Sequence, residues 1–142
     1  LKKHAAEAKL VSFFKFALTP EELSRHISSE LKTILPIDIC ILGMGVDMHM
    51  ASIFPGADRI KDALDLSSSQ IVLPITLLGT NETRLTLTAR VLREAPKIHL
   101  LLNGLEKKMV LDNALKAKDN WEKAPIRSVL FSENSVTIHY AN

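Results

Sequence analysis

Asp47 and His49 lie two residues apart in the stretch LGMGVDMHMASIFPGAD, residues 42–58, and together they could perform acid–base chemistry. A carboxylate beside an imidazole orients the ring and stabilises its protonated form, which suits a general base near neutral pH. The alternative is an ordinary turn that holds a histidine and a capping aspartate, and for an isolated Asp-x-His this alternative has more weight. A zinc site is disfavoured, because one His and one Asp lack the further ligands that the metal needs.

Two glycines, Gly43 and Gly45, precede this pair. They invite comparison with the dinucleotide-binding pattern G-x-G-x-x-G, but Met48 occupies the third glycine position and the expected acidic residue after a second strand has no clear counterpart. We therefore reject nucleotide binding. Glycines at this place can instead turn the backbone tightly and bring its N–H groups close to a ligand oxygen.

Two cations could reach an anion near the same loop. Arg84 begins a predicted strand, and Lys107 lies in the first turn of a helix that Gly104 opens. The N-terminus of a helix adds its own attraction for phosphate. Taken singly, each side chain is more simply a solvated surface cation.

Alternating helices and strands position these residues. Thr19, Pro20 and Glu22 form a helix start, and apolar residues at helical spacing follow until Pro36. Residues 37–42 are apolar nearly throughout and predict a strand covered on both faces. Further strands are expected over residues 71–75, 84–88, 97–102 and 135–140, a helix over residues 89–94, and an amphipathic helix from Gly104 with Met109, Val110, Leu111, Ala114 and Leu115 on its apolar side.

This alternation predicts one α/β domain over residues 1–142, a mainly parallel sheet with helices on both faces. Ligands of such sheets bind in loops beyond the carboxyl ends of the strands. Two loops qualify, residues 43–56 and residues 103–107. Both hold the candidate residues described above.

Composition excludes several classes of function. The net charge of +2 and the scattered basic residues do not favour a nucleic-acid or membrane-surface binder. No apolar stretch is long enough to span a bilayer, and the first ten residues lack the apolar core of a signal peptide. The single cysteine, Cys40, lies in an apolar run, so a reducing, cytoplasmic location fits best.

The motifs resemble those of a known family. GMGxDxHxASxFPG, from Gly43 to Gly56, is similar to the signature loop of the 6-phosphogluconolactonase family. Further matches follow in the same order: RxTLT from Arg84, LLLxGxEK from Leu100, PIR from Pro125 and VTIH from Val136. The resemblance runs from about residue 6 onward, and implies a sugar-phosphate isomerase/deaminase-like fold that lacks its N-terminal portion.

The resemblance also implies an activity, the hydrolysis of 6-phospho-glucono-δ-lactone to 6-phosphogluconate in the oxidative pentose phosphate pathway, with no metal or organic cofactor. His49 is then the expected general base and Asp47 its orienting partner. Backbone N–H groups around Gly43 to Gly45 are candidates for holding the oxyanion. Arg84 and Lys107 match phosphate-binding positions, and Gly104 belongs to the same substrate-binding set.

The sequence departs from the family pattern in two ways. Met48 stands where many members have Gly, and a positive φ there would strain a methionine; Met50 stands where many have Thr. A Ser/Gly-rich phosphate loop and an Asp-Glu-Arg segment, which members carry ahead of this region, are absent from this sequence. We therefore expect the chain to match the carboxyl-terminal part of such enzymes and to be weak or inactive alone.

Two other functions remain open. One is a sugar-phosphate isomerase or deaminase of the glucosamine-6-phosphate type, which places a catalytic Glu just before the Pro of the loop. That position is Phe54 here, and a phenyl ring transfers no proton. The other is a non-catalytic module that binds sugar phosphates. Nothing in the sequence predicts an oligomeric state.

Overall fold

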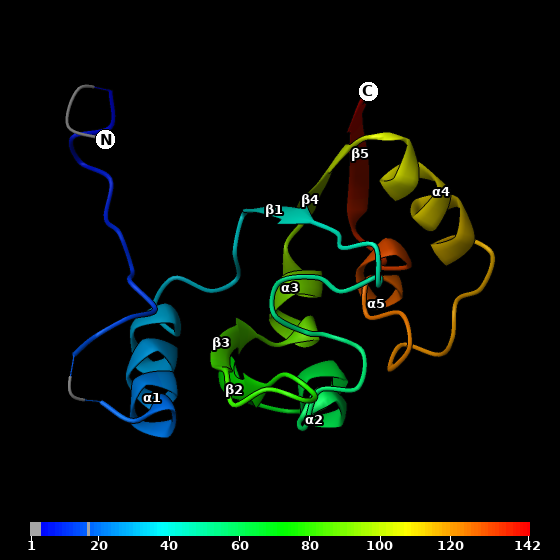
Figure 1. Ribbon diagram of the computed structural model, residues 1–142. Helices are drawn as coiled ribbons and strands as arrows, with labels where there is room; N and C mark the ends of the chain where they lie inside the picture. Colours follow the sequence, from blue (N-terminus) through cyan, green and yellow to red (C-terminus); the bar gives the residue numbers. More distant parts are fainter. Residues whose placement is uncertain (1–3, 17) are drawn as a thin grey trace.

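The computed structural model describes residues 4–16 and 18–142 of the chain (Figure 1). In these residues it has ten helices and strands, which alternate except where β3 follows β2 and α5 follows α4. In chain order they are α1 (Pro20–Leu31), β1 (Ile39–Gly43), α2 (Ile60–Leu64), β2 (Val72–Thr76), β3 (Thr83–Leu87), α3 (Ala89–Glu94), β4 (Lys97–Asn103), α4 (Leu105–Ala114), α5 (Arg127–Leu130) and β5 (Ser135–Ala141).

The strands form two sheets. Three of them make a parallel sheet in the order β1-β4-β5, with Ile41 opposite His99 and His99 opposite Thr137. The predicted α/β class with a parallel sheet is confirmed. β2 and β3 instead form an antiparallel pair of their own. The short connection between them explains this arrangement, because a parallel pair needs a long crossover and an antiparallel pair needs only a turn.

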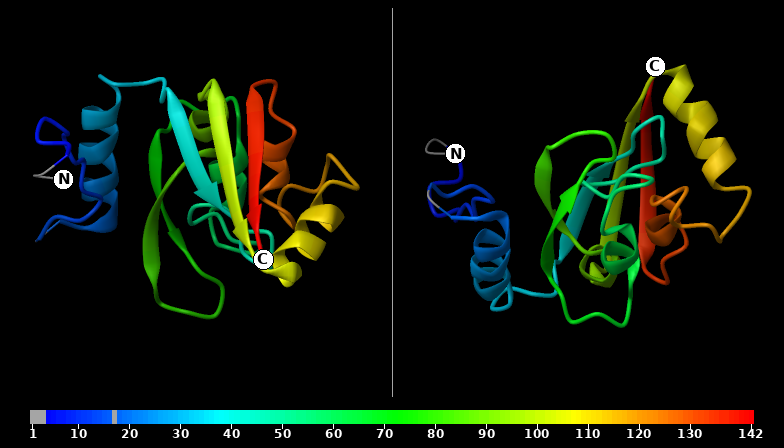
Figure 2. Two further views of the ribbon diagram at one scale, coloured as in Figure 1. Left: turned by 90° about the horizontal axis from the view of Figure 1, so that it is seen from above. Right: turned by 60° about the horizontal axis from the view of Figure 1, so that its bottom comes forward.

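Helices pack on one face of the parallel sheet. Figure 2 shows α2, α3 and α5 behind the three strands, and no described helix in front of them. Cys40 and Leu42 of β1 are buried on the helix side, whereas Ile39 and Ile41 are 53% and 65% exposed. The expectation that residues 37–42 would be covered on both faces is therefore wrong, because no described element packs against the second face.

The first helix packs against the β2–β3 pair. Leu23, Ile27 and Leu31 form a separate small core with Val72 and Val91. The helix ends at Leu31, five residues before the proline that the sequence analysis took as its limit. Its beginning is as predicted: the Glu22 amide donates to Thr19 Oγ1, at 3.3 Å, and the Thr19 amide donates to Glu22 Oε2, at 2.8 Å.

The fourth helix meets the core along a narrow stripe. Leu111 and Ala114 are buried, but Met109 is 64% and Leu115 43% exposed. Including those two residues in the apolar side was wrong. At 3.6 residues per turn Met109 points almost opposite to Leu111, and Leu115 lies just after the last residue of α4. α3, β4 and β5 lie where they were predicted, whereas α2 and α5 were missed because four or five residues are too few to show a helical period. No helix in the described part of the chain is long and apolar enough to cross a membrane.

Removal of the cap at α1 tests this account of the helix start. Thr19→Ala should lower the free energy of unfolding by about 1 kcal/mol at pH 7, measured by urea denaturation. Hydrogen bonds from Thr19 hold the pKa of Glu22 below its ordinary value of 4.5. The stabilisation that the ionised Glu22 carboxylate contributes is thus complete above that value, and it is lost as the pH falls through the lowered pKa. Ser29→Ala, an exposed change on the same helix, is the control, and an equal effect at both positions would contradict the capping role.

Candidate active site

The loop after β1 is closed by its own backbone. The Met48 amide donates to the Gly45 carbonyl at 3.0 Å, and the Gly45 amide donates to the His49 carbonyl at 3.1 Å. The buried side chains of Met44 and Met50 hold the loop against the core on either side of this turn. The Ile126 amide donates to the Met48 carbonyl at 3.0 Å, which ties the loop to the segment that begins α5.

This closed turn brings His49 against Asp47. Nδ1 of His49 lies 2.6 Å from Oδ1 of Asp47, and the same carboxylate oxygen accepts the His49 amide at 3.1 Å. The His49 side chain is 29% exposed and that of Asp47 is 48% exposed. When the neutral imidazole donates from Nδ1 to the carboxylate, Nε2 is left as the nitrogen with a free lone pair.

Gly45 leaves the room in which this pair fits. A Cβ at position 45 would lie 2.2 Å from Nδ1 of His49 and 2.5 Å from Oδ1 of Asp47. No side chain can be accommodated there unless both groups move. The sequence analysis considered Gly45 for its backbone N–H, but that N–H is already bonded to the His49 carbonyl. The absence of a side chain is what the geometry requires of this residue.

Two residues of the same loop have the left-handed backbone that favours glycine. Met48 has φ 66° and Ala51 has φ 48°. The strain that the sequence analysis made conditional for Met48 is therefore present, and a non-glycine residue in this region costs about 1 kcal/mol or more. The packing of the half-buried Met48 side chain against the main core opposes this cost.

Phe54 stacks on the catalytic candidate. Its ring centroid lies 4.0 Å from that of His49, with 31° between the planes. The Arg84 guanidinium also lies over the Phe54 ring, with its carbon 5.4 Å from the ring centroid, and Arg84 Nε donates to Glu82 Oε1 at 2.8 Å. This hydrogen bond holds the pKa of Glu82 below its ordinary value and raises the pKa of Arg84. Glu82, the residue just before β3, was missed by the sequence analysis, although its i, i+2 spacing to Arg84 puts the two side chains on one side of an extended chain.

A pocket of about 490 Å³ gathers four of the predicted residues: Gly43, Gly45, His49 and Lys107 all line it. Asp47 joins them through its hydrogen bond to His49, whereas Arg84 and Gly104 are not among the lining residues. Gly104, with φ 88°, precedes α4 and donates its N–H to the Ala141 carbonyl at 3.0 Å. Thr86, which also lines the pocket, accepts the Ser52 amide at 3.3 Å and was not predicted.

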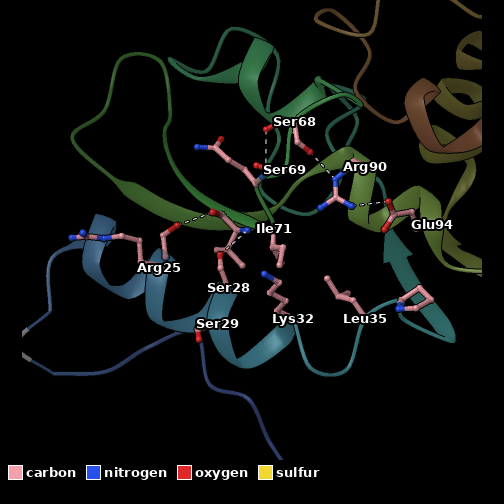
Figure 3. Close-up of a pocket in the computed structure, with 14 residues that line it drawn as sticks. Arg25, Ser28, Ser29, Lys32, Leu35, Ser68, Ser69, Ile71, Arg90 and Glu94 are labelled. Carbon is pink, nitrogen blue, oxygen red and sulfur yellow. Dashed lines mark hydrogen bonds and ion pairs between the residues drawn. The ribbon is translucent and has the colours of Figure 1, made fainter.

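A larger pocket, of about 990 Å³, lies between α1, α3 and the segment before β2 (Figure 3). It is rich in serines, and Arg25 and Lys32 stand at its side. Arg90 is held there by the Ser68 carbonyl at 2.8 Å and by Glu94 at 2.6 Å. None of the sequence-predicted site residues lies in it, and no histidine is among its lining residues. The pocket of about 490 Å³ that His49 and Lys107 line is therefore the candidate active site. No group of three or more potential metal ligands gathers within the described residues.

Gly45→Ala should displace the His49 ring and break its 2.6 Å hydrogen bond to Asp47, since the new methyl group would overlap both. The side-chain ¹⁵N signals of His49 in NMR spectra report this bond. Gly43→Ala is the matched control, because nothing lies within 4 Å of a Cβ at that position. Unchanged His49 signals in Gly45→Ala, with circular dichroism confirming the fold in both variants, would contradict the steric role.

Comparison with known proteins identifies the family of the chain. The family described as glucosamine-6-phosphate isomerases/6-phosphogluconolactonase matches residues 1–138. A 6-phosphogluconolactonase of Rhizobium meliloti is 38% identical over 131 residues, which cover 92% of this chain and 56% of that protein. One of Pseudomonas aeruginosa is 33% identical over 141 residues, covering 99% of this chain and 58% of that protein.

The fold agrees as well. The crystal structure of a 6-phosphogluconolactonase from Shewanella baltica superposes with a TM-score of 0.88 at 26% identity, over 97% of this chain and 59% of that one. The chain thus spans less than two thirds of the relatives that it matches, and it corresponds to their carboxyl-terminal part. From these matches, the chain belongs to the glucosamine-6-phosphate isomerase/6-phosphogluconolactonase family.

Proposed function

We propose that this chain supplies the catalytic base of an enzyme that hydrolyses 6-phospho-glucono-δ-lactone to 6-phosphogluconate, in the oxidative pentose phosphate pathway of the cytoplasm. The observation that carries the proposal is the 2.6 Å contact between His49 Nδ1 and Asp47 Oδ1, beside a pocket that Lys107 also lines. A base, its orienting carboxylate and a cation for the phosphate are the parts that this reaction needs.

In the proposed reaction, Nε2 of His49 takes a proton from water while the water oxygen attacks the lactone carbonyl carbon. The tetrahedral intermediate then collapses, the bond from the carbonyl carbon to the ring oxygen breaks, and the imidazolium returns its proton to that oxygen. Asp47 holds the ring through Nδ1 and stabilises the imidazolium between the two steps. The product is a hydroxy acid, and no electron is gained or lost.

The developing oxyanion needs donors near the carbonyl. The Gly45 amide is bonded within the loop, so we assign this role to the other backbone N–H groups around Gly43. Lys107 is positioned to hold the substrate phosphate from the first turn of α4. Arg84 would join it after exchanging Glu82 for the phosphate, since their exposed ion pair is weak.

Phe54 favours hydrolysis over a sugar-phosphate isomerase or deaminase reaction. The isomerase and deaminase resemblance would require a carboxyl group at this position, whereas the phenyl ring stacked on His49 can only orient the base and shield it from water. Attack of water on a lactone needs no second acid. A non-catalytic module that binds sugar phosphates is the other candidate, supported by the part of the relatives' length that this chain does not span.

The test uses a chimaera in which the amino-terminal part of the Rhizobium meliloti lactonase precedes this chain. It should hydrolyse the lactone, and His49→Ala should lower kcat by about 100-fold or more. His26→Ala, a surface histidine of α1, is the matched control. A folded chimaera that binds sugar phosphates without hydrolysis would favour the binding module, and release of ammonia from glucosamine 6-phosphate would favour the deaminase. The 142-residue chain alone should be much weaker than the chimaera.

Lys107→Met in the same chimaera should raise KM for the phosphorylated lactone about tenfold or more, because a charged hydrogen bond to phosphate is lost. It should change KM for unphosphorylated glucono-δ-lactone little. Lys108→Met is the control: Lys108 is adjacent in sequence but lies over Tyr140, with Nζ 5.6 Å from the ring centroid. Equal changes for both substrates would remove Lys107 from the phosphate site.

A further inference from the structure

The larger of the two pockets described above, of about 990 Å³, lies outside the candidate active site and shares no lining residue with it. α1 forms one wall, and α3 with the segment before β2 forms the other (Figure 3). Arg25, Ser28, Ser29 and Lys32 recur at positions i, i+3, i+4 and i+7, so all four lie on one side of α1 and the residue that follows it. We call this space the serine pocket.

Arg90 enters the serine pocket from α3 and is held in place by two hydrogen bonds. Its Nε donates to the Ser68 carbonyl at 2.8 Å, and its Nη1 donates to Glu94 Oε1 at 2.6 Å. The side chain is only 22% exposed. Its third nitrogen, Nη2, donates to no acceptor in the described part of the chain. Because a guanidinium is rigid and planar, fixing two of its nitrogens also fixes the direction of the third. Arg90 is therefore a preformed donor for an anion.

A second cation reaches the serine pocket from the opposite wall. Figure 3 shows the Lys32 side chain extending from the end of α1 into the space that Arg90 faces. The lining includes three cations, Arg25, Lys32 and Arg90, and one carboxylate, that of Glu94. Glu30, the acidic residue nearest to Lys32 in sequence, is not in the lining and pairs at 3.3 Å with a lysine of the segment before α1. The charge of the pocket therefore favours an anionic ligand.

Serine hydroxyls complete the polar lining. Ser28 Oγ accepts the Val72 amide at 3.2 Å, and Ser68 Oγ accepts the Gln70 amide at 3.2 Å. A hydroxyl that accepts a hydrogen bond keeps its own O–H as a donor. Both serines can thus donate to a ligand oxygen without losing the bonds that they make to the backbone.

We propose that the serine pocket is a second binding site, which takes a phosphate monoester of a small polyhydroxylated compound. Lys32 and Nη2 of Arg90 would hold the phosphate, because ammonium and guanidinium groups bind phosphate oxygens through charged hydrogen bonds. The serine hydroxyls would bind the hydroxyl groups of the same ligand. A pocket of about 990 Å³ has room for a whole small molecule and not only for an ion. Nothing in this site uses His49, so its binding is separate from the reaction proposed above.

The test titrates the ¹⁵N-labelled 142-residue chain with sorbitol 6-phosphate and follows the amide signals by NMR. Signals of residues 68–72 and 89–94 should shift and saturate, whereas those of residues 43–49 report any binding at the candidate active site. Sorbitol without phosphate should cause no shift. Inorganic phosphate should bind more weakly than the ester, because it makes no contacts through hydroxyl groups.

Two substitutions should change the affinity in opposite directions, which a general loss of folding could not do. Lys32→Met, an exposed change, should weaken binding of sorbitol 6-phosphate about tenfold, because a charged hydrogen bond to phosphate is lost. Glu94→Gln should tighten it about threefold, because a negative charge is removed while the amide oxygen can still accept from Arg90. Lys116→Met, an exposed lysine just beyond α4, is the matched control and should leave the affinity unchanged.

Several results would overturn the second site. They are the absence of saturable shifts at residues 68–72 in the folded chain, shifts confined to residues 43–49, and equal losses of affinity in Lys32→Met and Lys116→Met. Equal affinity for inorganic phosphate and the ester would overturn the polyhydroxylated ligand. The same titration of the chimaera described above shows whether the pocket stays open beside the amino-terminal part of a relative. Binding by the chain and not by the chimaera would count against the site.

Discussion

The parallel pairing of β1 with β4 is the constraint on which the candidate site depends. Parallel strands end at the same edge of a sheet, and the register places Gly43 opposite Leu101. The loop that carries His49 and the turn that leads to Lys107 therefore emerge side by side, although the two residues lie 58 positions apart in the sequence. The buried side chains of Cys40, Leu42, Ile98 and Leu100 hold this pair of strands against the helices behind it.

Within the loop, the geometry of the base results from a balance of local strain and local bonding. Met48 holds a left-handed backbone that glycine would adopt at lower cost. Its side chain packs on the core, and its carbonyl accepts the Ile126 amide, so the strained residue connects the loop to α5. Gly45 is needed for a different reason, which is space. Met48 accepts backbone strain and Gly45 leaves space for the imidazole ring. Both are consistent with a loop whose shape serves mainly to position His49.

Much of this arrangement could be predicted from the sequence, because local patterns determine it. The Thr19–Glu22 capping box and the apolar runs of β1 and β4 are each formed by residues that lie within a few positions of one another along the chain. The antiparallel pairing of β2 with β3 follows from the length of their connection, which an apolar pattern does not reveal. The exposure of Ile41 could not be read from its residue type, since an isoleucine in an apolar run gives the same pattern whether or not its face is covered. Thr86 entered the site only through its contact with Ser52, 34 residues away, whereas Glu82 lies two residues from Arg84 and could have been found from that spacing.

The strength of the pairing between His49 and Asp47 depends on how far water reaches the loop. The hydrogen bond between His49 and Asp47 is formed within the loop and needs no other element, but water still reaches both side chains. Water screens the attraction between the Asp47 carboxylate and a positive charge that develops on His49, and this attraction strengthens where water is excluded. Phe54, whose ring centroid lies 4.0 Å from that of His49, already covers one side of the base. Occupation of the pocket and electrostatic strengthening of the base are thereby coupled, since a ligand bound beside His49 displaces the water that screens the pair.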